Sequence, residues 1–189
     1  MTFMHKRELM VQHRPLFLVG LSGVGKTTIG KVLAGMLGYS FVDTDAQIEQ
    51  EQDNSIAAIF TSLGQDTFRR LETELLEKLL PLTRVVVATG GGLPCYGCNM
   101  MLMLQHGQVV YLDSPLEVLA QRLFIVKDTR PLVAKMSKLQ IKTYLEEARQ
   151  QRHSYYSQAH HRVIVGELIT EEQVQAVARE IYGIVTSAL

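Results

Sequence analysis

Short apolar runs recur along the chain, separated by longer segments in which apolar residues return every three or four positions. Four of these runs are apolar at consecutive positions, which predicts strands buried on both faces, as in a parallel sheet covered by helices. A more mixed run at residues 39–42 fits a further strand of the same kind. The five predicted strands are residues 16–19, 39–42, 85–88, 109–112 and 163–165.

The segments between the strands have the period of amphipathic helices. After the first strand, Ile29, Val32 and Leu33 begin an apolar stripe at helical spacing, and Gly38 is placed to end that helix. Further along, Gly64 separates two helical patterns. The later predicted helices are residues 45–51, 55–63, 65–80, 114–123 and 138–159, followed by one at the end of the chain.

Two of these helices begin with a capping pattern. Ser114, followed by Pro115 and Glu117, predicts a helix whose first amides are bound by the serine hydroxyl. Thr170 and Gln173 predict a reciprocal pair of the same type at the start of the last helix.

The alternation of strands and helices predicts the fold class. Five parallel strands joined by helices give a doubly wound α/β domain, with a five-stranded sheet flanked by helices and right-handed crossovers. A chain of 189 residues suits one such domain, which we place at residues 15–189. Residues 1–14 are polar and aperiodic, so we expect a flexible N-terminal extension.

Composition narrows the range of partners and compartments. The chain is 47% hydrophobic and contains 19 basic and 19 acidic residues, so no net charge attracts nucleic acid or an anionic membrane. No apolar run approaches the roughly 20 residues that cross a bilayer, and the first residues lack the apolar core of a secretory signal. We therefore expect a cytoplasmic protein with neither nucleic acid nor membrane as a partner.

The segment after the first strand has the spacing of a phosphate-binding loop. Glycines permit the tight turn, and the helix that begins at Lys26 adds its first amides and the positive end of its dipole. Lys26 is placed to reach the β- and γ-phosphates of a nucleotide, and the Thr27 hydroxyl to hold Mg²⁺. The nucleotide-binding residues predicted here are Ser22, Gly23, Val24, Gly25, Lys26 and Thr27.

Two more polar loops follow predicted strands. Asp43-Thr44-Asp45 ends the second strand, and Gly90-Gly91-Gly92 follows the third. Three successive glycines bring bare backbone close to another group, and open α/β sheets bind ligands at the carboxyl ends of their strands. The two loops and the phosphate loop therefore predict one active site.

The two cysteines, Cys95 and Cys98, have the spacing of a redox or zinc motif. No second pair accompanies them, and a disulfide framework is excluded by their number. The better interpretation is two ordinary thiols at the start of a helix, with a functional role as the alternative.

In their order and spacing, these motifs resemble the shikimate kinase family of small P-loop kinases, over nearly the whole chain. The resemblance implies transfer of the γ-phosphate of ATP to the 3-hydroxyl of shikimate, in the pathway to chorismate and the aromatic amino acids, by a monomer that uses Mg²⁺. It rests on the phosphate loop, Asp43-Thr44-Asp45, Phe68-Arg69-Arg70-Leu71-Glu72 and Thr89-Gly90-Gly91-Gly92, and extends to Arg130-Pro131-Leu132 and residues 152–156.

On the substrate side, the resemblance gives roles to five residues. Asp45 matches the aspartate that binds the shikimate hydroxyls and accepts a proton. Arg69 and Arg152 match the arginines that bind the carboxylate, a role suited to the two parallel hydrogen bonds of a guanidinium. Gly91 matches a backbone amide donor, and we place Gly92 beside it in the substrate site.

On the nucleotide side, Lys26 and Thr27 keep the roles given above. Asp43 matches the acid that steadies the hydration shell of Mg²⁺, so it acts through water. Arg130 matches the arginine of a mobile lid, at about residues 124–133, that closes over ATP and neutralises charge on the transferring phosphoryl group. The catalytic residues expected are Lys26, Asp45 and Arg130.

The lid departs from the family pattern, because Phe124-Ile125-Val126 stands where a more polar run is common. The resemblance therefore leaves open whether Arg122 stacks on adenine. Two other functions are considered: a different small-molecule kinase on the same scaffold, such as a gluconate kinase, and an ATP-binding regulator without catalysis. The regulator would be expected to lose Lys26, Asp45 or Arg130, and all three are present.

Overall fold

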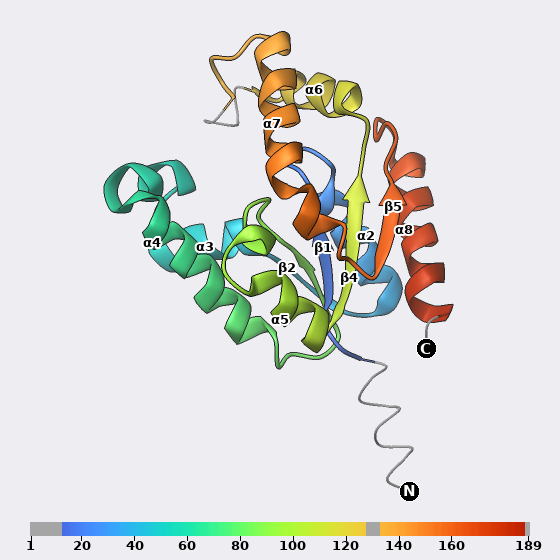
Figure 1. Ribbon diagram of the computed structural model, residues 1–189. Helices are drawn as coiled ribbons and strands as arrows, with labels where there is room; N and C mark the ends of the chain where they lie inside the picture. Colours follow the sequence, from blue (N-terminus) through green and yellow to red (C-terminus); the bar gives the residue numbers. More distant parts are fainter. Residues whose placement is uncertain (1–12, 128–132, 188–189) are drawn as a thin grey trace, which may run out of the picture.

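The computed structural model describes residues 13–127 and 133–187, in which five short strands form one parallel sheet (Figure 1). The strand order is β2-β3-β1-β4-β5, and each neighbouring pair is parallel. The predicted doubly wound α/β fold is confirmed. The strands are β1 (Leu16–Val19), β2 (Ser40–Asp43), β3 (Val85–Ala88), β4 (Gln108–Asp113) and β5 (His161–Ile164).

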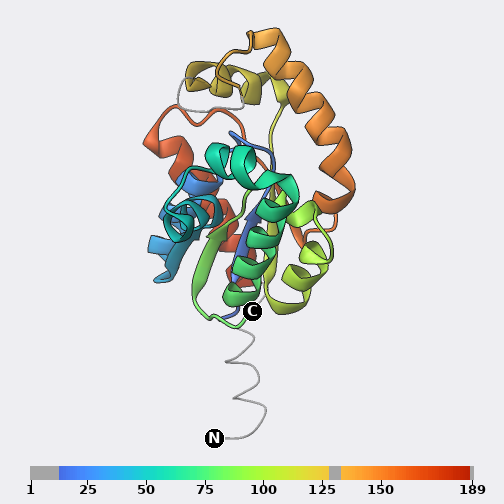
Figure 2. The same ribbon diagram turned by 90° about the vertical axis from the view of Figure 1, so that its left-hand side faces the viewer.

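Helices cover both faces of the sheet. Helices α2 and α8 pack together on one face, while α4, α5 and α7 lie on the other (Figures 1 and 2). Helix α6 and the first turns of α7 stand beyond the carboxyl ends of the strands. The helices are α2 (Lys26–Leu37), α3 (Thr44–Gln52), α4 (Ile56–Leu79), the 3₁₀ turn η1 (Leu93–Cys95), α5 (Asn99–His106), α6 (Leu116–Ile125), α7 (Lys138–Tyr156) and α8 (Glu171–Ser187).

The core explains why the central strands are continuously apolar. Every residue of β1 and β3 is buried, because helices lie above and below them. Between the sheet and α7, the rings of Tyr111 and Tyr156 pack with centroids 5.2 Å apart. This contact fixes one end of α7 against β4.

The predicted cap at Ser114 is wrong. Helix α6 begins at Leu116 with Pro115 as its N-cap, one residue later than the capping pattern requires. Ser114 therefore lies outside the helix, and its buried hydroxyl has no hydrogen-bond partner within residues 13–127 and 133–187. The other predicted cap is present: Thr170 Oγ1 accepts from the amide of Gln173 at 3.3 Å, and Gln173 Oε1 accepts from that of Thr170 at 3.0 Å.

Two predicted features fall partly outside the described residues. Of the N-terminal extension, only His13 and Arg14 are described. The lid is described only at its two ends, and Arg130 lies outside the described residues. Within those residues, no helix has the length and apolar character that crossing a membrane requires.

Gly64 sets the bend that separates the two predicted helices, 55–63 and 65–80. It lies inside α4 at φ 78° and ψ 168°, a conformation that essentially only glycine adopts. No atom lies within 4 Å of a Cβ built there, so the constraint is one of backbone and not of space.

We predict that Gly64→Ala lowers the free energy of unfolding by about 1–3 kcal/mol, through backbone strain alone. Gly35→Ala is the matched control, because Gly35 is equally open but lies at a regular position of α2. The free energy of unfolding of Gly35→Ala should rise by about 0.4–1 kcal/mol, because alanine leaves the unfolded chain fewer conformations than glycine does. Urea unfolding of both variants checks this, and a shift in the same direction for both would contradict it.

Candidate active site

The phosphate loop lies between the buried strand β1 and helix α2. Gly20, Gly23 and Gly25 have φ values of 144°, 83° and 102°, so the loop needs glycine at all three positions. A Cβ on Gly20 would also collide with the carbonyl oxygen of Leu112 in β4. In the described part of the chain no side chain caps the start of α2, which is the arrangement that binds phosphate at helix N-termini.

Lys26 extends back across this loop. Its Nζ donates to the carbonyl oxygens of Gly20 and Leu21 at 2.8 and 2.9 Å. The ammonium group is therefore held at the mouth of the loop, where phosphates of a nucleotide would lie.

The donor set for a magnesium ion lies beside the lysine. Thr27 Oγ1 donates to Asp43 Oδ2 at 2.6 Å. The other carboxylate oxygen of Asp43 caps α3 by accepting from the amides of Asp45 and Ala46, which fixes its orientation. A hydroxyl and a carboxylate are the hard oxygen ligands that Mg²⁺ takes, so these residues fit the predicted ion.

A cavity of about 500 Å³ extends over the loop. Its lining includes the polar residues Lys26, Thr27, Asp43 and Asp45. It also includes the apolar residues Val118, Ile125, Leu168 and Ile169. The size and the mixed polar and apolar lining suit a nucleotide, whose phosphates are anionic and whose base is flat and largely apolar.

Each of the three glycines after β3 faces one predicted substrate ligand. A Cβ on Gly90 would collide with the Asp45 carboxylate, and one on Gly92 with the Arg69 guanidinium. A Cβ on Gly91 would lie 3.0 Å from Nη1 of Arg152. The structure thus brings Asp45, Arg69 and Arg152, which are far apart in the sequence, around one stretch of bare backbone.

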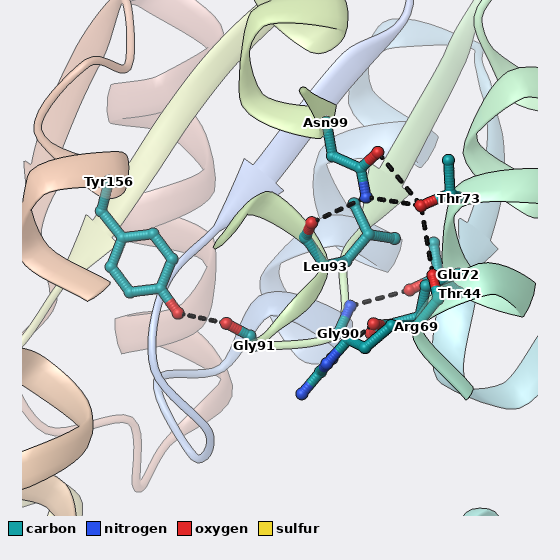
Figure 3. A network of polar contacts seen from close by, with 9 residues as sticks. All are labelled: Thr44, Arg69, Glu72, Thr73, Gly90, Gly91, Leu93, Asn99 and Tyr156. Carbon is teal, nitrogen blue, oxygen red and sulfur yellow. Dashed lines mark hydrogen bonds and ion pairs between the residues drawn. The ribbon is translucent and has the colours of Figure 1, made fainter. Parts of the chain in front are cut away.

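Buried polar contacts hold this stretch in place (Figure 3). The amide of Gly90 donates to the fully buried hydroxyl of Thr44 at 2.7 Å, which joins the start of α3 to the loop. Nearby, Asn99 donates to the carbonyl of Leu93 at 2.9 Å and to Thr73 Oγ1 at 3.1 Å. Helix α4 is thereby tied to η1.

Comparison with known proteins gives the family. The family model described as Shikimate kinase matches residues 22–182. The chain belongs to the shikimate kinase family. Its activity is therefore that of an ATP-dependent phosphotransferase.

Individual relatives agree with the family assignment. A shikimate kinase from Phocaeicola vulgatus is 40% identical over 161 residues, which are 85% of this chain and 92% of the relative. A solved shikimate kinase from Bacteroides thetaiotaomicron has a TM-score of 0.89 at 32% identity, over 92% of this chain and 99% of that one. Another, from Acinetobacter baumannii in complex with shikimate, has a TM-score of 0.82 at 31% identity, over 96% and 97%.

A solved gluconokinase from Sinorhizobium meliloti matches with a TM-score of 0.50 at 19% identity, over 93% of this chain and 98% of that one. That likeness shows the fold alone. The family model and the relatives above support a shikimate kinase over both the gluconate kinase and the regulator considered above.

Glu72 ends the motif Phe68-Arg69-Arg70-Leu71-Glu72, but the resemblance assigns it no role in the site. The residue is 1% exposed and pairs with Arg69. Burial raises the pKa of Glu72 to about 7, although the positive charge of Arg69 lowers it. The spacing of three residues between Arg69 and Glu72 on one helix is the sequence signal for their pairing. No feature of the neighbouring sequence indicates that Glu72 is buried.

Asp45 also has a shifted pKa. Burial raises it most, the neighbouring Asp43 raises it further, and Lys26 acts in the opposite direction. A carboxylate with a raised pKa is a better proton acceptor than an exposed aspartate, as its predicted role requires.

Arg122 reaches the loop from α6. Its guanidinium donates to the carbonyl oxygens of Gly23 and Val24, at 3.5 and 3.4 Å, and to that of Gly166. It thus links the phosphate loop to the segment before α8, while adenine stacking stays untested.

The cysteines lie at a helix start, as predicted. Cys95 ends η1 and Cys98 precedes α5, and both are free thiols. Burial raises the pKa of the Cys95 thiol to about 11, so it is poorly suited to form a reactive thiolate.

We predict that Glu72→Gln becomes more stable relative to the wild type as the pH rises from 5 to 8. The folded protein holds the Glu72 proton more tightly than the unfolded chain, so the wild type loses stability as the group ionises between pH 4.5 and 7. The difference in the free energy of unfolding between Glu72→Gln and the wild type should change by up to about 3 kcal/mol. Urea unfolding at both pH values measures it, and a relative gain for the wild type would mean that Arg69 keeps Glu72 ionised.

Proposed function

We propose that the loop Gly90-Gly91-Gly92, with Asp45, Arg69 and Arg152, holds shikimate while the phosphate loop presents the γ-phosphate of ATP to its 3-hydroxyl. The observation that carries the proposal is that each of the three glycines faces a different one of the three side chains. The complex of the Acinetobacter baumannii relative with shikimate supports the choice of acceptor.

The charges of the site suit an acceptor with a carboxylate at one end and hydroxyls at the other. Arg69 and Arg152 supply two guanidinium groups, of which Arg69 is held by its ion pair with Glu72. A guanidinium binds a carboxylate through two parallel hydrogen bonds, which fixes orientation as well as position. Asp45 then receives the hydroxyl end.

The acceptor and the nucleotide meet at Asp45. Its side chain lines the same cavity as Lys26 and Thr27, and its carboxylate packs against Gly90. In our proposal Asp45 hydrogen-bonds the 3-hydroxyl and accepts its proton as the phosphoryl group arrives. Lys26 stabilises the charge on that group, and we expect Arg130 to add to this effect.

Thr27 and Asp43 are the residues that would hold Mg²⁺, Thr27 directly and Asp43 through water. When bound, the ion neutralises charge on the β- and γ-phosphates. We also propose that the protein is monomeric and cytoplasmic and that residues 124–133, approximately, form a lid. The N-terminal residues 1–14 take no part in the chemistry.

Asp45→Asn should lower kcat by about 10²–10⁴-fold, because amide nitrogen and oxygen cannot accept the proton. ATP affinity should stay near that of the wild type, since the change touches the acceptor side. Asp53→Asn is the control: it removes an exposed carboxylate at the end of the same helix, at a φ of 47° that asparagine tolerates. Steady-state kinetics and ATP titration test this, and an equal loss of ATP affinity would refute the role.

Arg69→Lys should raise the KM for shikimate by roughly tenfold, because a point charge replaces a two-pronged hydrogen-bond donor. The neighbouring Arg70 is exposed and contacts Thr67, so Arg70→Lys is the matched control and should leave this KM unchanged. If Arg69→Lys has the KM of the control, Arg69 does not bind the carboxylate.

A further inference from the structure

The carbonyl oxygens and the amides of the loop Gly90-Gly91-Gly92 differ in their hydrogen bonding. All three carbonyl oxygens accept hydrogen bonds: Gly90 from Leu93 N at 3.2 Å, Gly92 from Cys95 N at 3.0 Å, and Gly91 from the Tyr156 hydroxyl at 2.5 Å. The amide of Gly90 donates to Thr44, as described above. The amides of Gly91 and Gly92 have no acceptor within residues 13–127 and 133–187.

The hydrogen bond from Tyr156 decides how one of these amides points. A peptide group is planar and, throughout the described residues, trans, so the carbonyl of Gly91 and the N–H of Gly92 point in opposite directions. Holding the carbonyl toward α7 turns the N–H away from α7. A loop of glycines has no side chains of its own to hold this orientation, so the Tyr156 hydroxyl adds a restraint to those of the backbone hydrogen bonds.

The surroundings of Tyr156 suit it to this task. The side chain is 1% exposed and its ring packs against Tyr111, so the hydroxyl has little freedom to move. Burial raises the pKa of Tyr156, which keeps the hydroxyl protonated and able to donate. Figure 3 shows the hydroxyl aimed at the carbonyl of Gly91.

Arg152 lies near the same hydroxyl. Arg152 and Tyr156 are four residues apart on α7, so their side chains lie on one face of the helix, and the two groups interact electrostatically. Tyr156 therefore hydrogen-bonds one of the groups that we assign to the acceptor and lies beside another.

We propose that Tyr156 is a positioning residue that aligns the Gly91-Gly92 peptide and the Arg152 guanidinium for the same bound acceptor. The inference rests on the shikimate-binding roles proposed above for these residues. Its consequence is selective: losing the hydroxyl should weaken binding of the acceptor carboxylate and leave the nucleotide side unaffected.

Tyr156→Phe tests the proposal, because it removes the hydroxyl and keeps the ring against Tyr111. The KM for shikimate should rise roughly tenfold, as expected for a buried carbonyl left without its donor, while the KM for ATP stays near the wild-type value. Tyr155→Phe is the matched control, since the adjacent Tyr155 is half-buried and its hydroxyl has no hydrogen bond to any described residue. Thermal unfolding of both variants confirms that kinetics are measured on folded protein.

A second readout separates positioning from a general loss of packing. Methyl shikimate lacks the charged carboxylate, so the ratio of kcat/KM for shikimate to that for the ester should fall in Tyr156→Phe and not in Tyr155→Phe. An unchanged shikimate KM, an equal rise in both KM values or an unchanged ratio would overturn the proposal. Absence of shikimate turnover in the wild type would instead refute the proposed function itself.

Discussion

The parallel pairing of β2, β3 and β1 fixes where the three loops of the site begin. Asp43 in β2 pairs with Ala88 in β3, and Ala88 pairs with Leu18 in β1, so the strands end at one level. Thr89 reinforces this level by donating from its amide and its hydroxyl to the carbonyl of Leu18, both at 3.1 Å. The phosphate loop, the aspartates and the glycines therefore emerge side by side, as ligand sites do in open α/β sheets.

The close packing at this edge of the sheet explains why glycines and paired charges occur there. Asp45, Arg69 and Arg152 approach the backbone so closely that a Cβ on the facing glycine would collide with two of them and crowd the third. Charged groups at such density need partners, and Glu72 provides one for Arg69. Farther along the edge, Asp113 pairs with both Arg149 and Arg162, and the balance of burial against these two cations leaves its pKa below the usual range.

Much of this arrangement could be predicted from the sequence because it depends on local signals. Apolar runs marked the strands, and glycine spacing marked the phosphate loop. The contacts that were missed join distant segments. The hydrogen bond between Tyr156 and Gly91 spans 65 residues, and no sequence feature near either residue predicts it.

The cap at Ser114 was a local signal that failed, because the helix begins one residue later than the pattern implied. Arg130 keeps its predicted role without a test, because it lies outside the described residues.

The central claim is that this site selects shikimate through one carboxylate and the hydroxyls opposite it. The most direct test is ADP release by the wild-type chain with ATP and Mg²⁺, comparing shikimate with gluconate and quinate. We predict turnover that depends on shikimate and is absent with gluconate, whose flexible open chain cannot span Arg69, Arg152 and Asp45 in the same way. Turnover with gluconate, or none with shikimate despite ATP binding, would contradict the account.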